Sequence, residues 1–467
     1  MARSRAALLG GLAASAVLAA ANALLGYDVS VGLSVWPVAV IGIGIVVVRP
    51  SLGLYAAILC IPLESATLPV GGGQLTPAKG LLLLTAILLA VRWARNGAPG
   101  RPHAAHLALG LMIALALAGV IVARDSGQAL KICLAAVAYA VISVHVAAQG
   151  RGEVERILRC VVISAGVVGA VAALTTSTQQ LIGDIATNRA QAGFAQPNIF
   201  GVYLLLSIPV GLALSFSGPA KWRWAMRMCT LAALAGLGLS LSRASIIGTV
   251  VALAVLAAWP VLRRGLIVLM LMAVSTLVFA PSLFTSYPRI AVISQRLSTL
   301  TSGTGSAGGD RGALRATTPR MIGDHALLGV GEGNFPNYSL DYNLYDVYGL
   351  PFDHPHNLFL TVGAELGVGG LVLLLSLLIA IAASSVRAAE PDRLGRRDPL
   401  ALALAGVFLG LLVESQGDYP VRTDVVFAVL LIEVGALIAL ERQRRPMGAG
   451  RPVRATASQL GARELPA

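Results

Sequence analysis

Apolar segments long enough to cross a lipid bilayer recur along almost the whole chain of 467 residues. A membrane-spanning helix needs about 20 mostly apolar residues. The third segment is short and contains Pro62 and Glu64, so it can also be re-entrant, and the two segments that meet at Arg243 have almost no loop between them. These segments predict an all-α, polytopic transmembrane helix bundle of about 12–14 spans. Fourteen segments qualify: 6–26, 31–48, 52–68, 76–94, 104–123, 129–148, 157–176, 198–217, 225–242, 244–262, 265–282, 356–385, 399–416 and 423–441.

Composition agrees with a bundle whose main solvent is lipid. Only 12% of the residues are charged and mean hydropathy is +0.79, whereas soluble domains contain about 25% charged residues. The run at 6–26 is too long for the core of a signal peptide, so we interpret it as the first span. Cys60, Cys133, Cys160 and Cys229 lie in or at the end of apolar runs. Their positions disfavour a disulfide framework or a metal site.

Positive charge alternates with the predicted spans. If the N-terminus is cytoplasmic, every loop on the cytoplasmic side carries lysine or arginine, and these loops hold most of the 35 basic residues. The positive-inside rule therefore predicts that both termini are cytoplasmic. The net charge of +13 comes mainly from these short segments, where it sets topology and meets anionic lipid, so nucleic-acid binding is not expected.

The connections divide the chain into four parts. Residues 1–282 hold the first eleven predicted spans, and residues 283–355 form one long extracytoplasmic connection, called here the long loop. Residues 356–441 hold the last three spans, and residues 442–467 form a basic cytoplasmic tail that we expect to be disordered. Long connections in compact proteins are usually functional or disordered, so the long loop is the first place to look for a site.

The long loop is mixed in character and is expected to be partly helical. Residues 302–309 are rich in Gly and Ser and predict a flexible stretch. Asp310 follows as a candidate N-cap of a helix, and Pro319 is expected to break that helix or to begin a second one. Half of the ten tyrosines of the protein also lie in this loop.

Five arginines are predicted on the outer side, where positive charge is disfavoured: Arg189, Arg243, Arg311, Arg315 and Arg320. Arg243 lies where two apolar segments meet. It is interpreted either as an arginine that snorkels to the membrane interface or as part of an anion-binding site. Arg311 and Arg315 would share one face of a helix, where like charges repel unless an anion lies between them. A solvated helix face is the alternative for that pair. Arginine is well suited to two-point contacts with phosphate groups.

Two histidines precede the apolar segment 356–385, in the sequence Asp-His-Pro-His-Asn at 353–357. His356 would lie at the start of a helix, whose positive end favours the neutral imidazole that a general base needs. The alternative is that His356 is a histidine at the membrane interface with a structural role, as a helix cap or a packing residue. His354, His356 and Asp353 do not have the spacing of a standard zinc site, so no metal is expected.

A second candidate helix entry is Gln196-Pro197-Asn198, which follows Arg189 closely. Proline is common at the first position of a helix, so this is an ordinary N-terminus. Helix N-termini can also hold a phosphate group.

Four short motifs follow one another along this part of the chain. Together they resemble the superfamily of O-antigen ligases, O-antigen polymerases and protein O-oligosaccharyltransferases, over roughly residues 189–375 in detail. The motifs are Arg189 with Gly193-Phe194 and Pro197-Asn198; Leu241-Ser242-Arg243-Ala244; Asp310-Arg311 followed by Leu327-Leu328-Gly329-Val330-Gly331-Glu332-Gly333-Asn334-Phe335; and His356-Asn357 followed by Gly367-Val368-Gly369-Gly370.

The resemblance implies a multi-pass enzyme of the bacterial inner membrane with its active site on the periplasmic side. The donor would be a glycan on undecaprenyl pyrophosphate, and the acceptor a hydroxyl of a glycan, a lipid or a protein. His356 would act as the base in a single displacement that inverts the anomeric carbon. Arginines would take the place of a metal ion, so no cofactor is expected. The resemblance makes Arg311 catalytic, gives pyrophosphate binding to Arg189, Arg243 and Arg315, and gives supporting roles to Asn198, Asn357 and His354.

Three alternatives stay open at this point. An O-antigen or exopolysaccharide polymerase would differ from a ligase only in its acceptor, a second lipid-linked repeat unit. A flippase or transporter of lipid-linked glycans would need polar side chains along its path. The predicted spans offer few such side chains, at Glu64, Glu365, Glu414 and Glu433. A scaffold without enzymatic activity is the third alternative.

Overall fold

The structure is a computed structural model that describes residues 50–70, 73–100, 102–176, 189–265, 306–345, 349–392, 394–419 and 423–444. Within these ranges the protein is almost entirely helical, which confirms the predicted all-α bundle. The elements in chain order are α3 (Pro50–Leu59), η1 (Ile61–Leu63), β1 (Leu68–Val70), β2 (Gly73–Leu75), α4 (Pro77–Asn96), α5 (Ala104–Gly119), α6 (Ser126–Ala147), α7 (Arg151–Thr175), α9 (Pro197–Leu214), α10 (Ala220–Ser240), α11 (Arg243–Leu256), α15 (Ser306–Asp324), α16 (Phe335–Ser339), η2 (Leu340–Tyr342), α17 (Leu358–Ala389), α18 (Pro399–Glu414) and α19 (Asp424–Arg444).

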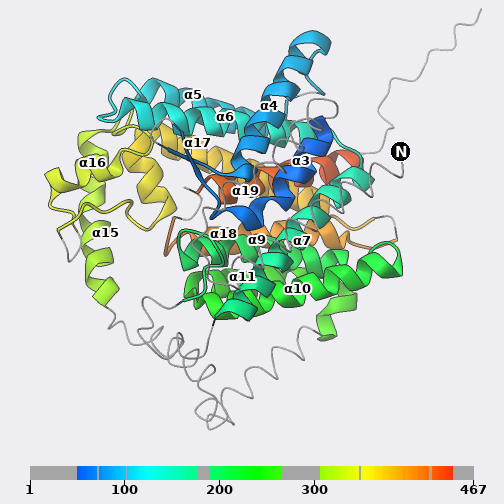
Figure 1. The fold of residues 1–467 in the computed structure, drawn as a ribbon. Helices are drawn as coiled ribbons and strands as arrows, with labels where there is room; N and C mark the ends of the chain where they lie inside the picture. Colours follow the sequence, from blue (N-terminus) through cyan, green and yellow to red (C-terminus); the bar gives the residue numbers. More distant parts are fainter. Residues whose placement is uncertain are drawn as a thin grey trace, which may run out of the picture.

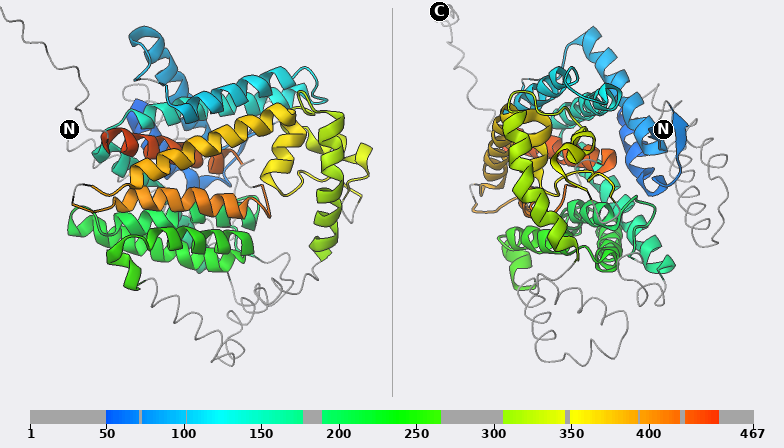
Figure 2. Two further views of the ribbon diagram at one scale, coloured as in Figure 1. Left: turned by 180° about the vertical axis from the view of Figure 1, so that it is seen from behind. Right: turned by 90° about the vertical axis from the view of Figure 1, so that its left-hand side faces the viewer.

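Most of the long helices run side by side, whereas α4 is steeply inclined to them, and α15 and α16 lie together at one end of the bundle, called here the loop end (Figures 1 and 2). Helix α11 packs on α18, α10 on α7, α19 on α6, and α5 on α17. Helix α9 is buried along most of its length. Small residues permit this close packing, since a Cβ atom built on Gly410 would lie 2.2 Å from the carbonyl oxygen of Gly248.

Five of the described helices are long and apolar enough to cross a membrane: α4, α6, α7, α9 and α17. Helices α5, α11 and α18 are shorter but equally apolar in character. Large apolar side chains are exposed on the helix surfaces, such as Leu111 at 58%, Leu134 at 56% and Ile379 at 69%. Contiguous exposed apolar surface is rare in soluble monomers and is expected where a helix meets lipid. The protein is therefore a membrane protein.

Most predicted spans coincide with a described helix. The spans 6–26 and 31–48, all of 265–282 except its first residue, and most of the tail lie outside the described residues. The third predicted span is not one continuous helix. It consists of α3, the 3-10 turn η1 and the first strand of an antiparallel hairpin in which Leu68 pairs with Leu75. Pro62 lies inside η1 and Glu64 directly follows it.

The helix in the long loop starts earlier and runs further than the sequence predicts. Helix α15 begins at Ser306, so Asp310 lies inside it and is not its N-cap. Pro319 also lies inside α15 and neither breaks it nor begins a second helix. The predicted flexible stretch was therefore wrong for residues 306–309, which are helical, while residues 302–305 lie outside the described part.

The long loop is joined to α17 through backbone hydrogen bonds at a break in that helix. Gly367 has a φ of 67°, in the left-handed region, and interrupts the helical ladder. The amides of Val330 and Gly331 donate to the carbonyls of Ala364 and Glu365, at 2.8 and 3.0 Å. These contacts fix residues 330 and 331 of the long loop relative to the first turns of α17.

Candidate functional site

Four chain segments meet at the loop end: the entry to α9, the turn between α10 and α11, the entry to α17, and the residues that follow α18. The side chain of Asn357 caps α17 by accepting hydrogen bonds from the amides of Phe359 and Leu360. The amide of Leu358 donates to the carbonyl of Ser415 at 3.0 Å. His356, the residue before Asn357, has a φ of 51°, a rare conformation for a residue other than glycine. The entry to α17 is thus held against the end of α18.

The side chain of Asp418 connects several of these segments through hydrogen bonds. Its Oδ1 atom lies 3.1 Å from Nδ1 of His356 and 3.8 Å from Nε2 of His354. Its Oδ2 atom accepts a hydrogen bond of 2.6 Å from the side-chain amide of Asn198. The amide of Tyr419 also donates to Oδ1, at 2.8 Å. Asp418 is only 6% exposed, so each of these bonds replaces water around a buried carboxylate.

The hydrogen bonds keep this carboxylate ionised. Burial alone would raise the pKa of Asp418, but the hydrogen bond from His356 and the charges of His356 and His354 bring its pKa below the usual range. An ionised carboxylate can only accept hydrogen bonds. Nδ1–H of His356 can donate to this carboxylate, and in that tautomer of the neutral ring Nε2 carries the lone pair.

Arg189 extends the network to the turn between α10 and α11. Its Nη2 atom donates to the side-chain oxygen of Asn198 at 2.7 Å, and its Nε atom donates to the carbonyl of Ser240 at 2.8 Å. The side chain of Asn198 therefore links the guanidinium of Arg189 to the carboxylate of Asp418 through two hydrogen bonds. Arg243 is the first residue of α11 and is half-buried three positions after Ser240. Arg189 and Asn198 therefore belong to the same hydrogen-bond network as His356, which they join through Asp418.

Arg311 and Arg315, one helical turn apart on α15, lie near the end of α18. The Nη2 atom of Arg315 donates to the carbonyl of Gln416 at 2.8 Å. Arg311 lies close enough to the buried carboxylate of Glu414 for its charge to act on it. The side chain of Asn357 donates to that of Gln416 at 3.3 Å. Through residues 414–418, the long loop and the His356 network therefore belong to one site.

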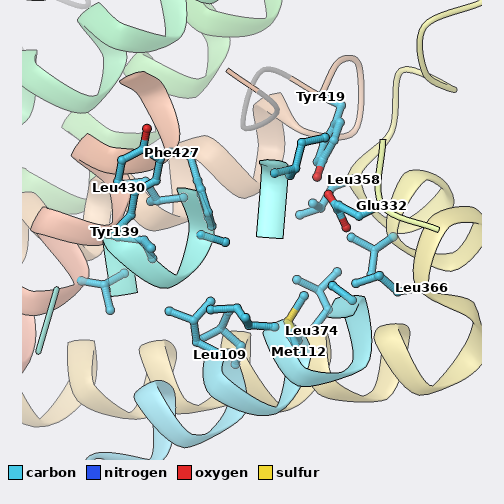
Figure 3. A pocket seen from close by; sticks show the side chains of 18 of the residues that line it. Leu109, Met112, Tyr139, Glu332, Leu358, Leu366, Leu374, Tyr419, Phe427 and Leu430 are labelled. Atoms are coloured by element: carbon cyan, nitrogen blue, oxygen red, sulfur yellow. The ribbon is translucent and has the colours of Figure 1, made fainter. Parts of the chain in front are cut away.

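Two cavities near this network share lining residues. A polar cavity of about 280 Å³ is lined by residues such as Lys79, His354 and Asp418. An apolar cavity of about 190 Å³ lies between α5, α6, α17 and α19. Figure 3 shows Tyr419 and Glu332 together at one end of the apolar cavity, with Leu430 at the other. Both cavities are lined by Tyr419 and Asp424, so a molecule with a polar head and an apolar chain could occupy them together.

His354, His356 and Asp418 also form a group that has the chemistry of a metal site. Their possible ligand atoms lie within 4.8 Å of one another. The carboxylate comes from beyond α18, which sequence spacing around 353–357 does not reveal. His354 already accepts a hydrogen bond from the amide of His356 at 3.1 Å through Nδ1, which leaves only its Nε2 atom for a metal.

Sequence reasoning missed Asp418 and Gln416. Both lie in the polar stretch Ser415-Gln416-Gly417-Asp418-Tyr419 at the predicted outer end of a span. A charged residue at a predicted outer helix end, on the same side as His356 and the arginines, is the signal that could have found Asp418.

A sequence model described as O-antigen ligase matches residues 228–375 of the chain. The matched part contains Arg243, Arg311, Arg315 and His356, but neither Arg189 nor Asp418. The match confirms the resemblance found in the sequence motifs. It indicates a membrane glycan transferase of the ligase or polymerase type. No curated protein matches the chain.

Proposed function

We propose that this membrane protein of the O-antigen ligase superfamily transfers a glycan from undecaprenyl pyrophosphate to an acceptor hydroxyl at the loop end. In the proposed topology the protein lies in the bacterial inner membrane, its termini are cytoplasmic and the loop end is periplasmic. The positive-inside distribution of charge supports this orientation. The long loop, residues 283–355, and the helices on either side of it would together form the enzyme.

The hydrogen bond between His356 and Asp418 is the observation that supports this proposal most directly. A buried carboxylate that holds Nδ1–H fixes the tautomer and the orientation of the ring, as the acid of a Ser-His-Asp triad does. Nε2 of His356 can then accept a proton from an acceptor hydroxyl. The side chain of His356 is 29% exposed, so a substrate can reach it while Asp418 stays buried.

The reaction would be one displacement at the anomeric carbon. The acceptor oxygen forms a bond to that carbon as its proton moves to Nε2 of His356. The bond from the carbon to the phosphate oxygen breaks, and the electron pair leaves with undecaprenyl pyrophosphate. A single attack from the opposite face inverts the configuration of the sugar carbon.

Arginines would stabilise the negative charge of the departing pyrophosphate. We assign Arg311 to the catalytic step because it approaches the end of α18 from the long loop, and Arg315 and Arg243 to pyrophosphate binding. Arg189 uses two of its donor atoms to hold Ser240 and Asn198. We therefore propose that Arg189 positions the Asn198–Asp418–His356 chain and adds positive charge to the pyrophosphate site.

The adjoining cavities suit an amphiphilic donor. We propose that the isoprenoid chain enters the apolar cavity between α5 and α17, and that the pyrophosphate and first sugar lie beyond Tyr419. Burial of apolar surface contributes about 25 cal/mol per Å² to such binding.

A reconstituted transfer assay tests the function. The full chain is placed in nanodiscs with a lipid-linked glycan, alone or with a glycolipid that lacks pyrophosphate. Release of undecaprenyl pyrophosphate and the mass of the glycan product are measured. Growth of chains on the lipid-linked glycan alone would identify a polymerase, and transfer to the glycolipid a ligase.

The matched variant is His356→Gln, which should insert normally and release no undecaprenyl pyrophosphate. A protein that moves labelled lipid-linked glycan across proteoliposomes but transfers none to any acceptor would be a transporter instead. Equal transfer by the wild type and His356→Gln would also overturn the proposal.

A further inference from the structure

A second polar cavity lies in the long loop, away from the His356 network. It has a volume of about 360 Å³, which is within the range of about 300–1,000 Å³ typical of small-molecule sites. Its walls come from the turn between α5 and α6, from α15 and from the segment α16–η2. The lining residues are Arg124, Thr317, Arg320, Asp324, His325, Tyr338, Asp341, Tyr342 and Asn343.

One wall is built around Arg124. Its guanidinium donates to Asp341 at 2.6 Å and to the carbonyl of Asn337 at 2.5 Å. The same group covers the ring of Tyr338 at 3.9 Å from its centroid, and His325 meets that ring edge-on at 5.2 Å. The hydroxyl of Tyr338 donates to the carbonyl of Val122 at 3.1 Å. These contacts fix an aromatic and charged surface before any ligand binds.

The lining also contains a second acid and a second aromatic ring. The hydroxyl of Tyr342 donates to Oδ2 of Asp324 at 2.9 Å. Burial and this hydrogen bond raise the pKa of Tyr342 to about 12, so the hydroxyl keeps its proton at neutral pH. Arg320, one turn before Asp324 on α15, is exposed and acts electrostatically on Tyr342.

We propose that this cavity binds carbohydrate, as a glycan subsite of the transferase proposed above, and the inference rests on that proposed function. Two carboxylates offset two guanidiniums, so the lining has no excess charge that would select an anion. Planar carboxylate, guanidinium and amide groups can pair with neighbouring sugar hydroxyls, each of which both donates and accepts. The half-buried ring of Tyr342 lines the cavity and can offer an apolar face to the C–H side of a sugar ring.

The position of the cavity suits a glycan that is bound at the transfer site. Helix α15 carries Arg311 and Arg315 toward the end of α18, and carries Thr317, Arg320 and Asp324 along the cavity. At 1.5 Å per residue, Asp324 lies about 13 Å along the helix from Arg315. A glycan of several sugar units can therefore extend along α15 from His356 to this cavity.

Binding of free oligosaccharide tests the inference without any transfer. The probe is the oligosaccharide released by mild acid from the host's own lipid-linked glycan, titrated calorimetrically into the full chain in nanodiscs. Asp324→Asn and Tyr342→Phe, which keep the shape of the cavity, should each weaken binding about tenfold, the loss expected for hydrogen bonds that involve a charged group. Tyr345→Phe is the matched control, because Tyr345 is an exposed tyrosine of the same loop outside the cavity.

His356→Gln separates this inference from the proposed function. It should abolish transfer yet bind the oligosaccharide as the wild type does. If Asp324→Asn and Tyr342→Phe bind as tightly as the wild type, or if His356→Gln binds no oligosaccharide, the cavity is not the glycan subsite. Displacement of the oligosaccharide by inorganic pyrophosphate only in proteins with an intact cavity would identify an anion site and overturn the inference. In transfer assays the two cavity variants should raise KM for the glycan and leave kcat unchanged.

Discussion

Nδ1 of His356 lies 3.1 Å from Oδ1 of Asp418, a residue 62 positions later in the chain. The two side chains come from the entry to α17 and from the segment after α18. Asn198 and Arg189, from a third part of the chain, complete the same network. A histidine oriented by a buried carboxylate, which itself lines a cavity, is an arrangement suited to general base catalysis.

Asp418→Asn should lower kcat by about 100- to 10,000-fold, the range attributed to general acid–base catalysis. The asparagine amide can donate to Nδ1 and so favours the wrong tautomer of His356. KM for the lipid-linked donor should change little, since Asp418 does not contact the pyrophosphate in the proposed mechanism. Steady-state kinetics in nanodiscs measures both quantities. His145→Gln, at the far end of α6, is the control. A variant with wild-type kcat would remove Asp418 from the mechanism.

Arg311→Gln and Arg315→Gln should each reduce kcat/KM for the donor by about 10- to 100-fold, because charge-assisted hydrogen bonds contribute about 1.5–3 kcal/mol. Arg311→Gln should act mainly on kcat, and Arg315→Gln mainly on KM. Both effects are measured at low and at high salt. Arg156→Gln, an exposed arginine near the start of α7 and away from the long loop, should have no effect. An equal loss of kcat/KM in all three variants would show that the net positive charge of the protein matters, and not a pyrophosphate site formed by Arg311 and Arg315.

The stability conferred by Asp418 should depend on pH. Its folded-state pKa lies below the unfolded value, which is about 3.9 for an aspartate. The contribution is therefore fully present above about pH 4 and is lost as the pH falls through the folded value. The melting temperature of the wild type should exceed that of Asp418→Asn at pH 7, and the gap should narrow at pH 3.5. A gap that stays constant over this interval would contradict the ionised buried carboxylate.

Chelation should leave transfer unchanged. In the proposed mechanism, arginines stabilise the leaving group, and His354 and His356 are engaged with Asp418 and with each other. Transfer is measured after incubation with EDTA and dialysis. A loss of activity that a divalent cation restores would show that the group of His354, His356 and Asp418 holds a metal.

Gly367→Ala should loosen the long loop. At a φ of 67° a Cβ atom would lie 2.4 Å from the carbonyl oxygen of Ala326, so both backbone strain and a clash oppose it. We expect a cost of roughly 1–3 kcal/mol and faster proteolysis within the long loop. Limited proteolysis in nanodiscs measures this. Gly323→Ala is the control, since a Cβ atom there meets nothing within 4 Å. Equal proteolysis rates for Gly367→Ala and the wild type would show that the break in α17 does not anchor the loop.

The bundle was largely predictable, because a bilayer imposes a length and a composition that single segments reveal. Arg189, Asn198, Arg315 and His356 were also singled out from the sequence, since each contrasts with apolar neighbours or belongs to a motif. Asp418 was not, because its importance comes from pairing across 62 positions. Local sequence shows a carboxylate near a helix end but cannot show which side chains the fold brings to it.

The errors in the long loop have a physical cause. Asp310 and Pro319 are strong local signals for the start and end of a helix, yet both lie inside α15. Packing of Leu314 and Met321, both fully buried with Phe335, outweighs those local preferences. Asn334 shows a contact that local sequence does not indicate: its side-chain oxygen accepts a hydrogen bond of 2.7 Å from the amide of Asp125, the residue that caps α6. A motif asparagine in the long loop thus serves as an anchor to the bundle.

The backbone joint between the long loop and the break in α17 sets where the protein can be cut and recombined. A graft bounded by the predicted loop, residues 283–355, would separate Val330 and Gly331 from the carbonyls of Ala364 and Glu365. A chimera with another transferase should therefore carry the stretch from 328 to 370 as one module. For the same reason, libraries aimed at new acceptors should diversify the exposed side of α15 and leave the joint unchanged.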